Sequence, residues 1–157
     1  MMVKSRKNRV LLIGVIFILL TFFVQISVFA QQIIVSDGYL RATIPGTSIS
    51  AAYMTIENLG ENSVTLTGAS SNISPSIEIH QHFMIDGMMK MRKQASFTLN
   101  GKDTVLLQPS GLHLMIFDLK KPLLPDELIT LTLHFSAQAD VVLNLPVQSI
   151  KQQQHHH

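Results

Sequence analysis

Apolar and polar residues alternate along most of the chain after residue 30, and this is the period of β-strands with one buried face. The clearest run extends from Leu128 to Phe135, and we expect its apolar face to belong to the core. That face consists of Ile129, Leu131, Leu133 and Phe135. The predicted strands are Ile33 to Ile44, Ser50 to Glu57, Ser63 to Ala69, Ser76 to Met84, Met88 to Arg92, Ala95 to Leu99, Thr104 to Leu107, Leu112 to Leu119, Leu128 to Phe135 and Val141 to Val147.

Turn-forming residues separate these runs. Asp86-Gly87 and Asn100-Gly101 supply residues that adopt positive φ, and Pro109-Ser110-Gly111 adds a fixed φ. Many short strands with such connections predict an all-β fold, an antiparallel Greek-key β-sandwich or barrel. We assign residues 31–150 to a single domain of this class, and we expect the Gln- and His-rich residues 151–157 to be a disordered tail.

The first thirty residues have the pattern of a signal peptide. Met1 to Arg9 is basic, Val10 to Val24 is almost wholly apolar, and Val28 and Ala30 are small residues at the −3 and −1 positions of a cleavage site. The pattern predicts cleavage before Gln31, and the alternative is an uncleaved membrane anchor. In both cases we expect a periplasmic or otherwise extracytoplasmic domain that meets the membrane only through this segment.

Charge and cysteine content exclude several function classes. The chain has 12 Lys and Arg against 10 Asp and Glu, but four of the basic residues and none of the acidic ones precede residue 31. Because the mature domain is then slightly acidic, we expect no nucleic-acid partner. The absence of cysteine excludes disulfides, thiolate metal cages, lipid-modified cysteine and blue-copper centres. Metal chemistry in this chain therefore depends on His, Met or carboxylate donors.

Histidine and methionine residues gather in the middle of the chain. The first group is His80, His82, Met84, Met88, Met89 and Met91. Asp86-Gly87 predicts a two-residue hairpin, and in that register His82 lies opposite Met91. In the same register Met84 lies opposite Met89. The donors that then share one face of the hairpin are His80, His82, Met84, Met89 and Met91. We expect the other face, with Ile77, Ile79 and Phe83, to join the core.

A second group, His113 and Met115, has the i, i+2 spacing that puts both side chains on one face of a strand. Because Pro109-Ser110-Gly111 precedes it, we expect His113 near a strand start, at the exposed rim of the sandwich. Thioether sulfur is a soft donor and imidazole a borderline one, so the combination favours Cu(I) over Zn²⁺ or Ca²⁺.

The spacing H-x10-M-x21-H-x-M, formed by His80, Met91, His113 and Met115, resembles the periplasmic copper chaperones of the PCu(A)C type. The segments Ala52 to Asn58 and Ile77 to His80 also look like that family. The resemblance implies a cupredoxin-like β-sandwich that binds one Cu(I) through these four residues. It also implies delivery of copper to the CuA centre of cytochrome c oxidase, or to its assembly partners.

The residues leave some assignments open. The hairpin register places His82, not His80, directly opposite Met91, so His82 is an alternative or auxiliary ligand unless a one-residue bulge shifts the register. Met89 is a second auxiliary candidate, and Met84, Met88 and Met89 form either a copper-collecting surface or half-buried packing. His155 to His157 are either a Cu(II)-binding tail or an expression tag.

Two function classes follow. The first is a metallochaperone rather than an enzyme, because no acid/base pair or substrate pocket is evident in the sequence. The alternative is a β-sandwich interaction module that binds no metal and uses its methionine-rich surface for docking.

Overall fold

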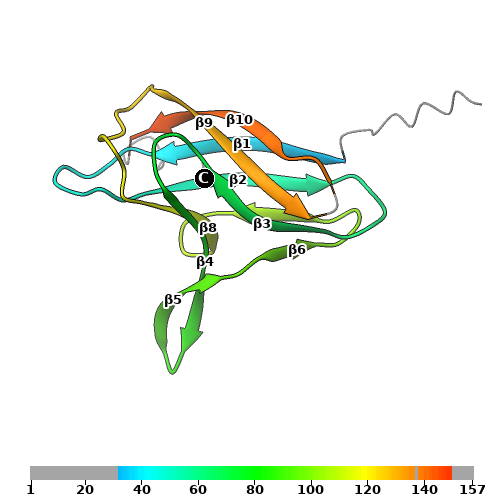
Figure 1. The fold of residues 1–157 in the computed structure, drawn as a ribbon. Helices are drawn as coiled ribbons and strands as arrows, with labels where there is room; N and C mark the ends of the chain where they lie inside the picture. The colour runs from blue at the N-terminus through cyan, green and yellow to red at the C-terminus, as the bar shows by residue number, and fades with distance from the viewer. Residues whose placement is uncertain (1–31, 137, 150–157) are drawn as a thin grey trace, which may run out of the picture. The chain divides into compact units, whose positions relative to one another are not determined.

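The computed structural model describes residues 32–136 and 138–149 (Figure 1). Every regular element in this part of the chain is a β-strand, so it offers no helix that could span a membrane. The predicted signal peptide (residues 1–30) and tail (residues 151–157) lie outside the described residues. The strands are β1 (Ile33–Arg41), β2 (Ser50–Asn58), β3 (Val64–Ser70), β4 (Ser76–Ile85), β5 (Met88–Gln94), β6 (Phe97–Leu99), β7 (Thr104–Leu107), β8 (Leu112–Phe117), β9 (Leu128–Ser136) and β10 (Val141–Gln148).

All ten predicted strands are present, and three of them are shorter than predicted. β1 ends at Arg41 instead of Ile44, and after it the backbone N–H of Thr43 donates to the carbonyl oxygen of Leu123, outside the sheet ladders. β8 ends at Phe117 because Asp118 takes a φ of 51°, which turns the chain out of the strand. β6 begins at Phe97, two residues after the predicted start.

The strands form two layers that are hydrogen-bonded at one edge. The first layer contains β5, β4, β8, β7, β2 and β1, and the second contains β10, β9, β3 and β6. They join through a short parallel pairing of β1 with β10, in which Leu40 is opposite Val147. The chain changes layer after β2, β3, β5, β6 and β8. The predicted all-β Greek-key sandwich is therefore confirmed.

The core lies between the two layers. The predicted apolar face of β9 is buried, with Leu131 and Leu133 at 0% exposure. From the first layer, Leu114 and Ile116 of β8 and Ile79 of β4 enter the same cluster. Because strand side chains alternate, the residues between them on β4 and β8 face outward, and this outer face carries the histidines.

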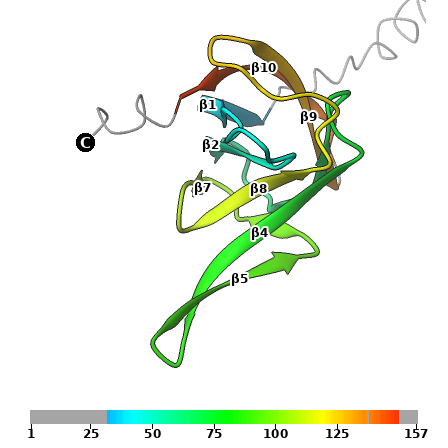
Figure 2. The same ribbon diagram turned by 90° about the vertical axis from the view of Figure 1, so that its left-hand side faces the viewer.

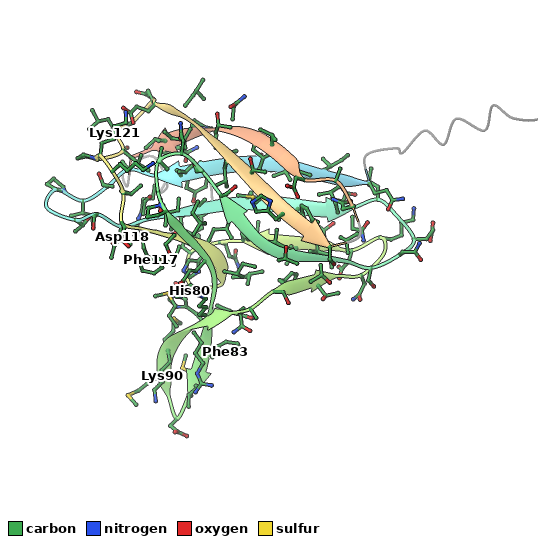
Figure 3. All side chains as sticks on the ribbon, in the orientation of Figure 1. His80, Phe83, Lys90, Phe117, Asp118 and Lys121 are labelled. Atoms are coloured by element: carbon green, nitrogen blue, oxygen red, sulfur yellow. The ribbon has the colours of Figure 1, made fainter. Side chains whose placement is uncertain are left out.

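The β4–β5 hairpin extends beyond the rest of the first layer (Figures 1 and 2). Its turn is the one predicted, with positive φ at Asp86 (51°) and Gly87 (75°). The prediction that Phe83 belongs to the core is wrong, because this side chain is 37% exposed. Phe83 lies on the part of the hairpin that has no second layer behind it (Figure 3). Ile77, nearer the sandwich, is half-buried, and Ile79 is buried as predicted.

Candidate metal centre

The candidate donors lie on the outer face of three adjacent strands, β5, β4 and β8. On the β8 side, His80 is directly opposite His113, and Glu78 is opposite Met115. On the β5 side, His82 is opposite Met91. The structure thus brings together residues from two sequence groups about thirty residues apart.

The hairpin register agrees with the sequence prediction at each predicted pair. Met84 is opposite Met89 and Ile85 is opposite Met88, with no register shift between β4 and β5. The bulge that would bring His80 opposite Met91 is therefore absent, and His80 is opposite Lys93 instead. His80 and Met91 are diagonal neighbours on one face, a separation that long side chains can span.

His113 is the most buried of the donors, with 4% exposure. This differs from the predicted place at an exposed rim, because the ring of Tyr53 (centroid distance 6.2 Å) and the neighbouring imidazoles cover it. Its Nδ1 donates to the carbonyl oxygen of Gly111 (3.0 Å), which leaves Nε2 with the free lone pair. Burial lowers the pKa of His113, and the Gly111 bond opposes that shift only in part. His113 is therefore a neutral, oriented imidazole at pH 7.

His80 is oriented by a carboxylate. Its Nε2 lies 2.8 Å from Oε2 of Glu78, whose other oxygen accepts from Nζ of Lys93 at 2.7 Å. The Lys93 bond, with the His80 bond, holds the pKa of Glu78 below its usual range. Because an ionised carboxylate can only accept, Nε2 of His80 carries a proton, and Nδ1 is the nitrogen that remains for a ligand. A histidine whose second nitrogen donates to a carboxylate or a carbonyl is the usual arrangement at metal sites.

Two imidazole nitrogens on this face are buried and lack a hydrogen-bond partner among the described residues. They are Nδ1 of His80 and Nδ1 of His82. The ring of His82 lies 5.3 Å from that of His113, and the ring of His80 lies 6.2 Å from it. Buried nitrogens without partners are costly unless something else binds them, so the cluster has the chemistry of a ligand site.

The thioethers differ in exposure. Met91 is 45% exposed on the hairpin, whereas Met115 is half-buried beside Ala51 of β2. In the described part of the chain, no group of three or more His, Cys, Asp or Glu residues could hold a metal ion. Methionine sulfur is the other donor type on this face, and a site that uses it favours a soft ion.

Aromatic rings border the site, and their place there was not predicted from the sequence. Phe117 lies 5.8 Å from His80, and the two are neighbours at the base of the hairpin (Figure 3). The ring centroids of Tyr39 and Tyr53 are 5.2 Å apart, and Tyr53 in turn lies beside His113. Burial raises the pKa of both tyrosines, so they stay neutral phenols. The i, i+2 spacing of Met115 and Phe117 was the available signal for the first ring.

The chain is similar to one family model and to relatives in two bacteria. The family model that matches residues 33–147 is described as "Putative lipoprotein LpqE-like". A protein of Leifsonia xyli named as a lipoprotein is 29% identical over 120 residues, covering 76% of this chain and 71% of that protein. An uncharacterised protein of Rickettsia prowazekii is 32% identical over 101 residues, which span 64% of this chain and 56% of that protein.

Solved PCuAC domains have the same fold. The copper-bound PCuAC domain from PmoF2 has a TM-score of 0.65 at 22% identity, over 75% of this chain and 93% of that domain. The apo solution structure of DR1885 from Deinococcus radiodurans has a TM-score of 0.59 at 27% identity, over 77% and 81%. Its Cu(I) form has a TM-score of 0.53 at the same identity, over 71% and 74%.

Proposed function

The chain belongs to the LpqE-like family, whose model matches most of its length, and we propose that it is an extracytoplasmic metallochaperone that binds one Cu(I). The ligands in this proposal are His80, Met91, His113 and Met115, called the four-donor set below. We further propose that the protein delivers copper to the CuA centre of cytochrome c oxidase, or to an assembly partner.

One observation carries the proposal. Two imidazoles are held across a strand pair, and each has one nitrogen bonded to a protein acceptor and the other available to a ligand. Thioethers from β5 and β8 lie on the same face. Nitrogen and thioether donors without thiolate or a carboxylate cage suit Cu(I) better than Zn²⁺ or Ca²⁺.

The solved structures of similar proteins support the proposal that the bound metal is copper. DR1885 has been solved both without metal and with Cu(I), and the PmoF2 domain has been solved with copper. The name of the Leifsonia relative supports a place outside the cytoplasm, as does the basic and apolar start of this chain. Because this chain contains no cysteine, we propose export by the signal segment without lipid attachment to cysteine.

The exposure of the donors suits transfer from protein to protein. Met91 lies on a strand whose residues 88–93 are all exposed, whereas His113 is 4% exposed. An acceptor can therefore approach Met91 first and displace the ligands one at a time, while His113 holds the ion until the last step.

The proposal is tested by anaerobic Cu(I) titration against a competing chromophoric chelator. The full chain is kept in mild detergent, and His155, His156 and His157 are changed to alanine so that the tail does not compete. We expect one tight equivalent. Met115→Ile and Met91→Ile should each weaken it while keeping the fold, because these exchanges roughly preserve volume. Met88→Ile is the matched control, because Met88 lies on the opposite face of the hairpin.

The role of His82 is tested in the same assay. Because His80 is directly opposite His113, we expect His80→Gln to weaken the tight equivalent more than His82→Gln. The reverse order would replace His80 by His82 in the four-donor set.

An interaction module without metal is the second candidate, and it is favoured by the exposed Phe83 and hairpin methionines. It predicts only weak binding of several Cu(I) ions, unaffected by Met115→Ile. Unfolding of the methionine variants would show instead that these residues serve the core.

A further inference from the structure

The outer end of the β4–β5 hairpin carries donors that the four-donor set does not use. Met84 on β4 is directly opposite Met89 on β5, and His82 precedes Met84 by one step on the same face. Directly opposed residues of an antiparallel pair have Cβ atoms about 4.5–5.5 Å apart, and the next residue on the same face follows at about 7 Å. Two thioethers and one imidazole therefore lie within reach of a single small ion.

We propose that His82, Met84 and Met89 form a second, weaker Cu(I) site, called the hairpin site, which takes up the ion before it passes to the four-donor set. This inference rests on the proposed copper-binding function. Three donors of this kind match the preference of Cu(I) for soft, low-coordinate sites.

His82 provides an independent observation. Its Nδ1 is buried without a hydrogen-bond partner in the described part of the chain, although the four-donor set does not require it. Its ring lies 5.3 Å from His113 and its strand position lies next to Met84 along the face. His82 is thus placed to be a ligand of the hairpin site and to pass the ion inward.

The exposure of the methionines agrees with a receiving role. Met84 is 67% exposed and Met89 is 54% exposed, so neither is needed to fill the core. Thioethers in water can bind an ion from solution without first being uncovered. Unlike imidazoles and thiols, they also need no deprotonation to bind.

Met88 is a natural control for this proposal. It is 57% exposed, close to the value of Met89, but it is opposite Ile85 on the other face of the hairpin. Its neighbours on that face include Phe83 and Lys90, which are opposite each other and offer no soft donor. An effect of exposed methionine in general would therefore appear at Met88 as well, whereas the hairpin site would not involve it.

The test is a titration with Ag(I), a redox-inert probe for Cu(I), of the full chain labelled with ¹³C at the methionine methyl groups. The chain is kept in detergent with the tail histidines changed to alanine, and signals are assigned by single Met→Ile variants. We expect the first equivalent to shift Met91 and Met115. The second should shift Met84 and Met89 and leave Met88 in place. Met84→Ile with Met89→Ile should remove the second equivalent and keep the first, and Met88→Ile should keep both.

The outcomes separate this inference from the proposed function. If the second equivalent is absent, or moves Met88 as much as Met84, the hairpin site is overturned and the four-donor set is unaffected. If the first equivalent moves Met84 and Met89 but never Met91 and Met115, the hairpin site is supported and the four-donor set fails. Loading of the four-donor set at the wild-type rate in the double variant would contradict the receiving role.

Discussion

The two sides of the candidate copper site differ in how firmly the fold holds them. On the β8 side, His113 is 4% exposed and its Nδ1 is bonded to Gly111. On the hairpin side, Met91 is 45% exposed, and among the described strands β5 pairs with β4 alone. The difference indicates that the β8 side can hold its ligands in a fixed direction, while the ligands on the hairpin side can be displaced by an acceptor. A protein that transfers an ion needs both properties, and a site buried on both sides would retain it.

The largest effect is expected at the buried side. His113→Gln keeps an amide that can donate to Gly111 but removes the imidazole, so we expect Cu(I) affinity to fall by more than about 100-fold, beyond the usual loss from outer-shell changes. Chelator competition measures the affinity, and circular dichroism checks the fold. Affinity within a factor of about ten of wild type, roughly 1.4 kcal/mol, would remove His113 from the site.

A smaller effect is expected at Glu78, which contacts the imidazole of His80 and not the ion. Glu78→Gln removes the ionised acceptor that fixes the proton on Nε2 of His80, and we expect a loss of about 10- to 100-fold in Cu(I) affinity. Nitrogen NMR of the His80 ring checks the cause, because the tautomer should become mixed in the variant. Lys93→Leu should give a weaker change in the same direction, because it removes the ammonium that bonds to Glu78 and adds no donor to the face. An unchanged His80 tautomer in Glu78→Gln would contradict this positioning role.

Lowering the pH should weaken Cu(I) binding only through protonation of the imidazoles. Protons compete with copper for nitrogen near the ordinary imidazole pKa of about 6.5 but not for thioethers, so affinity should fall between pH 8 and pH 5. Cu(I) affinity can fall by at most about tenfold per pH unit for each proton that copper binding releases. Since burial lowers the pKa of His113, the proton competes there only below the usual value. His113→Gln should therefore remove the part of the pH dependence that lies below about pH 6.5, and a flat wild-type curve would exclude histidine ligation.

The same shift has a consequence for the copper-free protein. Below about pH 6.5 the unfolded chain takes up a proton at residue 113 while the folded chain does not. The free energy of unfolding should therefore fall as the pH drops through this value, and this contribution should stop changing below the folded pKa. Denaturant unfolding at several pH values, with His113→Gln as the comparison, measures the difference.

The sequence predicted most of the fold and the positions of the donors, for reasons that particular residues make clear. Alternation along β9 determined its buried face, and Asp86-Gly87 determined the register of the hairpin. Local pattern could not reveal that Tyr53, sixty residues before His113, covers that ring. The contact of Glu78 with Lys93 was not predicted, because the predicted strand ended at Arg92 whereas β5 continues to Gln94.

The smallest effect is expected at Phe83, where the sequence prediction was wrong. A strand pattern shows which residues share a face but not where the opposing layer ends, and Phe83 lies past that end with 37% exposure. We expect Phe83→Ser to change the free energy of unfolding by no more than about 0.5 kcal/mol, as at other exposed sites. Ile79→Ala, four residues earlier on the same face and 2% exposed, should cost about 2–5 kcal/mol. Urea unfolding of the two variants measures both values. Equal losses would mean that the Phe83 face of the hairpin is covered in solution, and would contradict the view that the opposing layer ends before Phe83.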